Sequence, residues 1–302
     1  MENKFIYITD IHYGAKPINR KDNYNDAILK KLKYALSIAE KNNCTLLIGG
    51  DLFDNPKRLN FMDLNRLIKI IVSFNVDVYC IEGNESHDGI AESSPLELLK
   101  YAGIIKKDNN FIDFDNVRII FRGHNSNPNL KDFLYPKDKT NLLMTHETIV
   151  ENKVIFEHTS IQDYTTAADI VTIGHYHPYQ GIIKRHDGVH FVAPGAITRR
   201  KKVSHDINRV PKMVFMKFSE NKKFILKELD IPCDMDIWNE KTVIEIDENL
   251  FKNIKDEVEN MNNELNKNQG AMNLMDALKE FGKVLNASDD VMENVIKRMR
   301  EM

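Results

Sequence analysis

Cysteine is scarce in this chain, with three in 302 residues, and tryptophan occurs only once. The cysteines, Cys44, Cys80 and Cys233, are widely spaced, and the first two lie in apolar segments that are typical of buried strands. An odd number at long spacings does not favour a disulfide framework. We therefore expect reduced, buried thiols of the kind that cytoplasmic proteins contain.

Long apolar runs and a strong net charge are also missing. No apolar run approaches the roughly 20 residues that a membrane helix needs. The first residues, MENKFIYITD, lead directly into a strand pattern without the basic and apolar segments of a secretory signal. We therefore expect a cytoplasmic protein without membrane contact. The net charge is −3 and the pI is about 6.4, so any contact with nucleic acid depends on local basic patches.

Short apolar runs alternate with segments of helical periodicity in the first part of the chain. Runs at residues 4–10, 44–51 and 76–84 predict buried strands, and the spacing of apolar residues at 23–42 and 61–74 predicts helices between them. Continuous apolar strands belong to sheets that are covered on both faces, so this order predicts an α/β fold. Later apolar runs predict further strands at 141–147, 169–177, 189–195 and 211–218.

The character of the sequence changes after about residue 232. Apolar residues recur at helical spacing in 248–266 and again from Leu274 to Leu285, and Ser288 is typical of an N-cap that opens a last helix. The sequence thus predicts a main α/β domain at residues 1–232 and a small C-terminal helical region at 233–302.

Side chains that bind metals follow five of the predicted strands. They are Asp10-Ile-His12, Gly50-Asp51-Leu-Phe-Asp54, Gly83-Asn84, His146 and Gly174-His175-Tyr-His177. The carboxyl ends of strands form the natural crevice for a site in an α/β sheet, and the glycines are expected to let the backbone turn sharply there. Carboxylate, amide and imidazole ligands together suit a pair of divalent ions such as Mn²⁺, Fe²⁺ or Zn²⁺. Such a pair clamps a phosphate for in-line attack, and Asp51 could bridge both ions.

Each of these elements alone has an ordinary structural explanation. Asp54 could cap the next helix, Asn84 could be a turn residue, and His146 could be a hydrogen-bonded structural histidine. The combination is more specific, because all five tips follow apolar strands. It favours a metal site. His124, after Arg122-Gly123, could line the crevice or be a polar loop residue, and we expect the latter.

The order D-x-H, GD-x-x-D, GN, H and GH-x-H resembles the calcineurin-like metallophosphoesterase superfamily over residues 5–180. Three further segments are similar to SbcD-type nucleases, the nuclease subunits of the double-strand-break repair complex, called meiotic-recombination-eleven in eukaryotes and with relatives in some bacteriophages. These segments are GGDLFDNP (49–56), SPLELLKYAGII (94–105) and VAPGAITRR (192–200). The usual Pro-Gly-Ser turn of that family reads Pro194-Gly195-Ala196 here.

The resemblance implies a four-layer α-β-β-α sandwich with a helical appendage and two divalent ions, most often Mn²⁺. One ion would be held by Asp10, His12, Asp51 and His177, and the other by Asp51, Asn84, His146 and His175. It also implies a DNA exonuclease or single-strand endonuclease of recombination and repair. The implied partners are DNA, a second copy of the chain, and an SbcC-type coiled-coil ABC ATPase that binds the C-terminal helices.

The segment GNESHD departs from the family pattern, in which a catalytic histidine directly follows the asparagine. Either His87, oriented by Asp88, enters the site from a longer loop, or Glu85 takes the place of that histidine. We favour His87, because a carboxylate near a phosphate needs a proton or a metal ion. In a third interpretation His87 is a surface residue and the enzyme is slow or inactive.

A basic run after the predicted strand at 189–195 is a candidate contact for DNA phosphates, with a solvated loop as the alternative. The run consists of Arg199, Arg200, Lys201 and Lys202, and Lys57 and Arg58 form a second candidate patch. The leading hypothesis is a two-metal DNA nuclease. The alternatives are a phosphodiesterase or phosphatase for small substrates, and a catalytically weak scaffold of the same fold.

Overall fold

The computed structural model of the chain describes residues 2–56, 59–85, 94–124, 135–152, 154 and 157–239. All structural statements below concern this part of the chain. Three predicted site residues, His87, Lys57 and Arg58, lie outside it, as do residues 240–302 with the predicted C-terminal helices.

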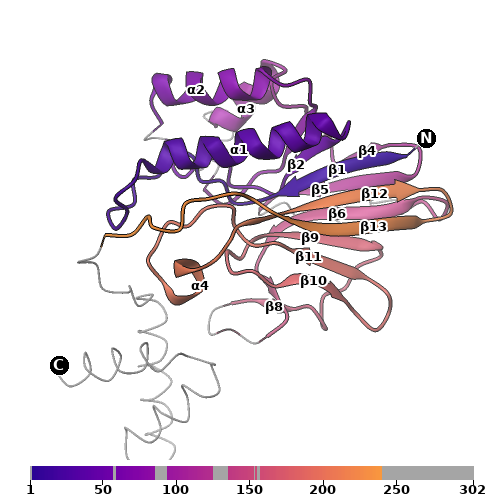
Figure 1. The fold of residues 1–302 in the computed structure, drawn as a ribbon. Helices are drawn as coiled ribbons and strands as arrows, with labels where there is room; N and C mark the ends of the chain where they lie inside the picture. The colour runs from indigo at the N-terminus through magenta and orange to yellow at the C-terminus, as the bar shows by residue number, and fades with distance from the viewer. Residues whose placement is uncertain are drawn as a thin grey trace, which may run out of the picture.

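Two β-sheets stack on each other and form the centre of the fold (Figure 1). The first sheet has, in spatial order, β13 (Lys223–Asp230), β12 (Lys212–Ser219), β1 (Asn3–Ile8), β2 (Thr45–Ile48) and β3 (Val78–Cys80). β1, β2 and β3 are parallel, whereas β12 and β13 continue the sheet in antiparallel fashion. The carboxyl ends of the three parallel strands therefore lie at one edge, as the sequence predicted.

The second sheet has, in spatial order, β10 (Gly181–Lys184), β11 (His190–Ala193), β9 (Ile170–His175), β6 (Thr140–Glu147), β5 (Val117–Arg122) and β4 (Phe111–Asp113). Its four central strands are parallel and its two edge strands are antiparallel to their neighbours. β6 and β9 are in register so that His146 pairs with Gly174 and Glu147 with His175. This register places the two predicted histidine tips side by side.

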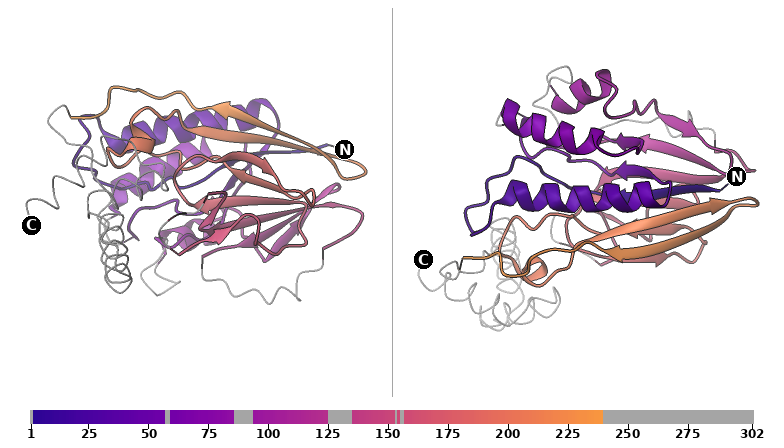
Figure 2. Two further views of the ribbon diagram at one scale, coloured as in Figure 1. Left: turned by 90° about the horizontal axis from the view of Figure 1, so that it is seen from below. Right: turned by 45° about the horizontal axis from the view of Figure 1, so that its top comes forward.

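Three helices cover the outer face of the first sheet, as the views in Figures 1 and 2 show: α1 (Tyr24–Lys41), α2 (Phe61–Val72) and α3 (Pro95–Tyr101). Asn23, Asn60 and Ser94 cap them, each with a side-chain oxygen that accepts a hydrogen bond from a backbone N–H of the first turn. α2 is thus capped by Asn60, so Asp54 does not have the capping role that was its structural alternative.

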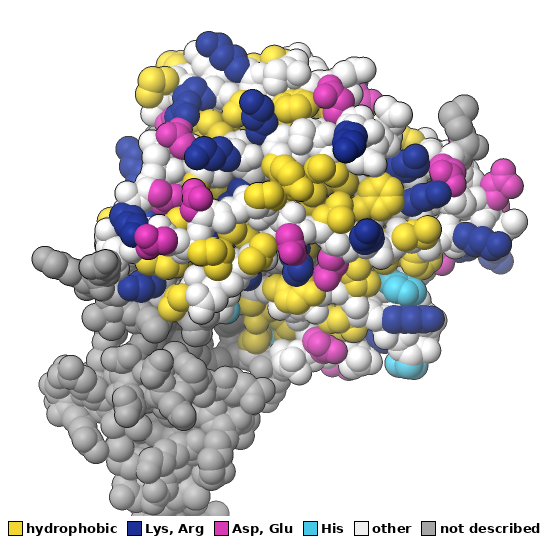
Figure 3. All heavy atoms as spheres, viewed as in Figure 1, with side chains coloured by type: hydrophobic (Ala, Val, Ile, Leu, Met, Phe, Trp, Pro, Cys, Tyr) yellow, Lys and Arg dark blue, Asp and Glu magenta, His cyan; other side chains and the backbone are white. Residues whose placement is uncertain are grey.

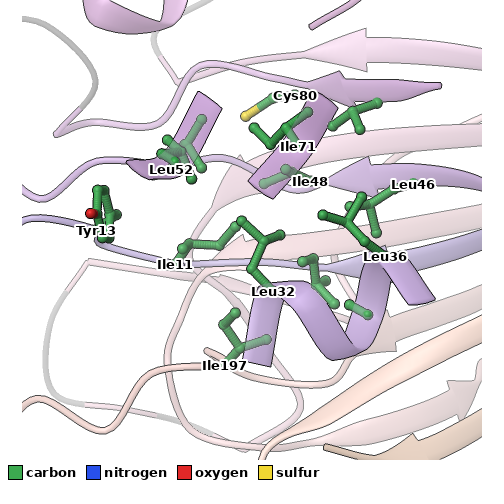
Figure 4. Close-up of a cluster of buried hydrophobic side chains, with 14 of the residues drawn as sticks. Ile11, Tyr13, Leu32, Leu36, Leu46, Ile48, Leu52, Ile71, Cys80 and Ile197 are labelled. Atoms are coloured by element: carbon green, nitrogen blue, oxygen red, sulfur yellow. The ribbon is translucent and has the colours of Figure 1, made fainter. Parts of the chain in front are cut away.

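Alternating residues of β1 enter two different hydrophobic clusters. Ile6 and Ile8 pack toward the helices, in the cluster of which Figure 4 shows a part, whereas Phe5 and Tyr7 pack toward the second sheet. All four are almost completely buried. Burial on both faces explains why this strand reads as a continuous apolar run instead of an alternating one.

The described part of the fourth layer consists of a short ribbon and a loop. A third cluster, on the outer face of the second sheet, is covered by the short ribbon β7 (Ile149–Val150) and β8 (Thr159–Ser160) and by Ile161, Tyr164 and Ala168. No helix covers this face among the described residues. The α/β architecture with two stacked sheets is confirmed. None of the described helices is long and apolar enough to cross a membrane.

The loop of residues 195–200, between β11 and the short helix α4 (Ser204–Ile207), is held by buried cations. Lys31 donates a 2.6 Å hydrogen bond from Nζ to one backbone carbonyl, Arg20 donates to another at 2.8 Å, and Arg209 donates to two more. Together they bind the four successive carbonyls of residues 196–199. Because a buried donor must be satisfied, these contacts fix the course of the loop.

Lys31 should give the fold a distinctive pH dependence. Burial lowers its pKa from 10.5 to about 7, and the nearby Arg199 acts in the same direction. Between these values the unfolded chain binds more protons than the folded one, so stability rises with pH in that window. We expect the free energy of unfolding of the wild type, relative to Lys31→Met, to rise from about pH 7 to about pH 10 in urea titrations. Parallel curves for the two proteins would contradict this assignment.

Candidate active site

Four predicted ligands adopt a left-handed backbone conformation just where their strands end. The φ angles are 52° at Asp10, 47° at His12, 45° at Asp51 and 76° at His175. Residues other than glycine rarely occupy this region, and such strain concentrates at functional sites, where the surrounding structure enforces it. After these turns, the ligand atoms of the four side chains lie in two neighbouring groups.

The three glycines that precede ligands serve two different purposes. Gly50 has a φ of 103° and makes a sharp turn, as predicted. Gly83 and Gly174 have no positive φ; instead, a Cβ at Gly83 would collide with the Asp51 carboxylate, and one at Gly174 with the carbonyl oxygen of Gly49. Gly174 lies within β9, so it does not make the expected turn. Both glycines are needed for the close approach of the strand tips.

The first group of donors consists of Asp10, His12 and His177. The Nε2 atoms of the two histidines are 3.0 Å apart, and Asp10 Oδ1 lies 3.8 Å from Nε2 of His12 and 3.6 Å from Nε2 of His177. Asp10 and His12 are buried, and the side chain of His177 is 25% exposed. Of these three described side chains, His177 is thus the one in contact with solvent.

The second group consists of Asp51, Asn84, His146 and His175. Nε2 of His146 lies 3.3 Å from Asp51 Oδ2 and 3.1 Å from Asn84 Oδ1, and the same oxygen of Asn84 is 2.7 Å from His175 Nδ1. Oδ2 of Asp51 is also 3.8 Å from Nε2 of His12 in the first group. Asp51 thus lies between the groups, in the position that a bridging carboxylate requires.

The donor chemistry fits two divalent ions. The structure brings all seven predicted ligands together. Within Asp10, His12 and His177, and within Asp51, His146 and His175, one ligand atom per residue lies within 4.8 Å of the others. Two buried carboxylates are costly without positive charge beside them. Carboxylate, amide and imidazole ligands in one set match the preferences of Mn²⁺, Fe²⁺ and Zn²⁺.

The pKa values of three of the histidines are shifted, two of them upward and one downward. Burial alone would lower the pKa of His12, but the carboxylates of Asp10 and Glu85 outweigh it and raise the pKa to about 9. Burial also acts to lower the pKa of His146, and interaction with Asp51 and Asp10 raises it above its ordinary value. For His175, burial and the neighbouring His146 lower the pKa. The carboxylates therefore bind the two most buried imidazoles most strongly.

Glu85, Arg200 and Asp54 form a chain of charges at the rim of the first group. Glu85 Oε2 is 2.8 Å from Nδ1 of His12, and 3.3 Å from Nη1 of Arg200, which in turn pairs with Asp54. Burial acts to raise the pKa of Glu85, but its bonds with His12 and Arg200 outweigh burial and lower the pKa to about 2. Glu85 is thus an ionised acceptor.

The predicted basic run separates into different environments. Arg199 is buried, and its guanidinium donates to the carbonyl of Asp234 and lies beside Cys233 Sγ. It is therefore unavailable to DNA, contrary to expectation, because its charge is used inside the protein. Lys201 is exposed, and Lys202 donates to the carbonyl of Asn239. Arg200 lies at the rim of the first donor group, where it contacts Asp54 and Glu85.

His124 lies in a turn, as expected, but beside the candidate ligands, which was the less favoured alternative. Its ring lies 5.8 Å from that of His175 and 6.3 Å from that of His146, centre to centre. It follows β5, a strand that was not predicted. The apolar residues in VRIIFR, read as a strand, would have made His124 a further strand tip with a polar side chain.

The comparisons with known proteins agree with this geometry. Residues 4–179 match the calcineurin-like phosphoesterases. The chain belongs to this family. The members of this family are phosphoesterases, and both donor groups lie within the matched residues.

Individual relatives are more distant from this calcineurin-like phosphoesterase. It is 26% identical over 101 residues to the DNA double-strand break repair protein Mre11 of Aeropyrum pernix, an alignment that covers 32% of this chain and 24% of that protein. Among solved structures, it is similar to the NAD nucleotidase NadN of Haemophilus influenzae (TM-score 0.45, 14% identity, 86% of this chain and 56% of that one). It is also similar to a 5'-nucleotidase precursor of Thermus thermophilus (TM-score 0.44, 12% identity, 86% and 59%). The chain thus spans well under two thirds of each.

Substitutions in each donor group should remove one ion at a time. We expect the wild type to bind two Mn²⁺ ions per chain, and His177→Ala or His175→Ala to lose one of them, since each residue belongs to one group only. Asp51→Ala should weaken both, because its carboxylate lies between the groups. Isothermal titration calorimetry on metal-free protein measures the stoichiometry. Loss of both ions from His175→Ala alone would show that the groups are not separable.

Proposed function

We propose that this calcineurin-like phosphoesterase is a two-metal DNA nuclease, an exonuclease or single-strand endonuclease that hydrolyses phosphodiester bonds in recombination or repair. The observation that carries the proposal is the pair of donor groups that share Asp51, with the guanidinium of Arg200 at their rim. The likeness to the repair protein Mre11 over 101 residues supports DNA as the substrate.

Each residue of the candidate site has a proposed role in phosphodiester hydrolysis. Asp10, His12, Asp51 and His177 would hold one ion and Asp51, Asn84, His146 and His175 the other. When bound, such ions neutralise phosphate oxygens and lower the pKa of water. Arg200 is placed to bind a neighbouring phosphate once it exchanges one of its carboxylate partners for the substrate. His124, beside the second group, is placed to give a proton to the leaving oxygen.

A small-substrate phosphodiesterase or phosphatase is the second candidate. The same donor groups would serve it, and two observations favour it. Arg199 is buried, which removes one cation from the predicted DNA contact, and the net charge of −3 gives no general attraction for DNA. A catalytically weak scaffold is the third candidate, because Glu85 stands where the family pattern has a catalytic histidine.

The partners proposed from the sequence are a second copy of the chain and an SbcC-type ATPase. For a homodimer, the supporting observation is a set of exposed apolar side chains on α2 and α3: Phe61, Met62, Val72, Leu98 and Tyr101. These two helices are neighbours in Figures 1 and 2. Figure 3 shows apolar side chains among basic ones over the helical side of the molecule. The proposed ATPase site, in the C-terminal helices, lies outside the described residues.

Substrate choice and the proton donor can be tested in one series. With Mn²⁺ as cofactor, we expect the wild type to cleave labelled linear DNA as well as bis-p-nitrophenyl phosphate. His124→Ala should lower kcat by about 100-fold or more, the usual contribution of a general acid, while Arg200→Ala should mainly raise KM for DNA. His87→Ala tests the alternative donor.

The outcomes separate the candidate functions. Cleavage of the small diester without cleavage of DNA would favour the second candidate. Binding of Mn²⁺ without any turnover would favour the scaffold, or an enzyme that needs its ATPase. Loss of activity in His87→Ala but not in His124→Ala would replace His124 by His87 as the proton donor.

The dimer proposal predicts that substitutions on the exposed faces of α2 and α3 change the oligomeric state of the protein in solution. We expect wild-type protein to sediment as a dimer and Phe61→Glu combined with Leu98→Glu to sediment as a monomer, because burying two carboxylates in an apolar contact is unfavourable. Ile225→Glu, an exposed apolar residue on β13, is the matched control and should stay dimeric. A monomeric wild type at all concentrations would refute the proposal.

A further inference from the structure

We propose that Glu85 is a positioning residue for the metal centre: it holds the imidazole of His12 with the proton on Nδ1, so that Nε2 presents its lone pair to the first donor group. The inference rests on the metal-dependent chemistry of the family and not on DNA as the substrate. It gives Glu85 a role that differs from both roles inferred from the sequence, since it neither donates a proton to the leaving group nor binds the ion directly.

The two ring nitrogens of His12 face different surroundings. Nε2 points into the first group, 3.0 Å from His177 Nε2 and 3.8 Å from oxygens of both Asp10 and Asp51. Nδ1 points to Glu85 Oε2 at 2.8 Å. A carboxylate only accepts hydrogen bonds, so this contact requires a proton on Nδ1. Imidazoles that bind metals commonly donate their other N–H to such an acceptor, which fixes the tautomer and the ring orientation.

Glu85 is better placed for this role than the other carboxylate near Nδ1. Asp54 Oδ1 is 3.7 Å from the same nitrogen, beyond hydrogen-bond distance, and pairs with Arg200. The backbone N–H of Glu85, moreover, donates to Asp51 Oδ1 at 3.0 Å. Residue 85 therefore bonds to one ligand through its backbone and to another through its side chain, and substitution of the side chain leaves the backbone contact in place.

In the second donor group, Nδ1 of the buried histidine also has a hydrogen-bond acceptor, but this acceptor is a backbone carbonyl. Nδ1 of His146 lies 2.7 Å from the carbonyl oxygen of Gly49, while Nε2 faces Asp51 and Asn84. Both fully buried histidines of the centre thus have an acceptor on Nδ1 and the donor group on Nε2. A backbone carbonyl serves His146, and a charged carboxylate, which makes the stronger bond, serves His12.

Direct ligation by Glu85 is the competing explanation. One ligand atom each of His12, Asp51 and Glu85 lies within 4.8 Å of the others, which is close enough for a shared ion. The contacts of Oε2 argue against it, because this oxygen is bonded to His12 Nδ1 and lies 3.3 Å from Arg200 Nη1. Both neighbours are hydrogen-bond donors, and a cation would have to displace them.

A double-mutant cycle in Mn²⁺ affinity distinguishes these explanations without any substrate. We expect Glu85→Ala to weaken binding of one Mn²⁺ ion by about 10- to 100-fold, the usual effect of removing an acceptor behind a ligand. Glu85→Gln should weaken it less, because the amide oxygen still accepts from Nδ1. In a His12→Ala background, Glu85→Ala should have no further effect, since the residue acts only through His12. Glu151→Gln, at an exposed position, controls for the change in net charge.

Two results would overturn the proposal. Equal losses from Glu85→Ala with and without His12 would identify Glu85 as a direct ligand, and an unchanged affinity in Glu85→Ala would leave it without a role at the centre. If His12→Ala does not fold, nitrogen NMR of ¹⁵N-histidine-labelled protein with Zn²⁺ replaces the cycle. The wild type should then show His12 protonated at Nδ1, and Glu85→Ala should lose that fixed tautomer. Because no step measures hydrolysis, a failure of the DNA nuclease proposal leaves this test intact.

Discussion

The carboxylate of Asp51 is the point on which the whole site depends. It is buried, its Oδ2 lies 3.8 Å from Nε2 of His12 and 3.3 Å from Nε2 of His146, and its Oδ1 accepts from the backbone of Glu85. Gly83 leaves the space that this carboxylate occupies, because any Cβ there would collide with it. The position and charge of this one group therefore set the spacing of the two donor groups.

The two sheets contribute different chemistry to the centre. The first sheet supplies the carboxylates, the amide and His12 from the ends of β1, β2 and β3, and the second supplies His146, His175 and His177 from β6 and β9. The apolar cluster between the sheets, with Phe5, Tyr7 and Leu142 among its members, keeps these ends together. Neither sheet alone carries all seven candidate ligands, so the packing of the two sheets is required to bring them together.

The loop of residues 195–200 connects the site to the rest of the fold. Its backbone bonds to both sheets: Ala196 N–H donates to the carbonyl of His177, and Ile197 N–H donates to that of Thr9. The cations Arg20, Lys31 and Arg209 bind its carbonyls. Because the backbone of the loop is fixed by these bonds, the side chains of two adjacent arginines point in different directions. Arg199 turns into the protein, and Arg200 turns toward Glu85 and Asp54.

The seven candidate ligands could be predicted from sequence because each follows a short apolar run, and the ends of parallel strands must meet at one edge. The same reasoning did not favour His124 beside the ligands, because β5 was not recognised, and it gave a turn to Gly174, which lies within β9. It also placed Arg199 on the surface, since a run of four basic residues carries no sign of which side chain points inward.

The sequence by itself determined the α/β class, the order of the strand tips and the types of donor at each tip, because local periodicity and residue chemistry are written along the chain. The resemblance to the family already implied two stacked sheets and a shared Asp51. Only the tertiary structure decided that Glu85 faces Nδ1 of His12, that Arg199 is buried and that His124 lies beside His146 and His175. These features depend on distances between residues far apart in sequence, such as the 73 positions that separate His12 from Glu85. Such distances are set by the packing of the two sheets, which no local pattern encodes.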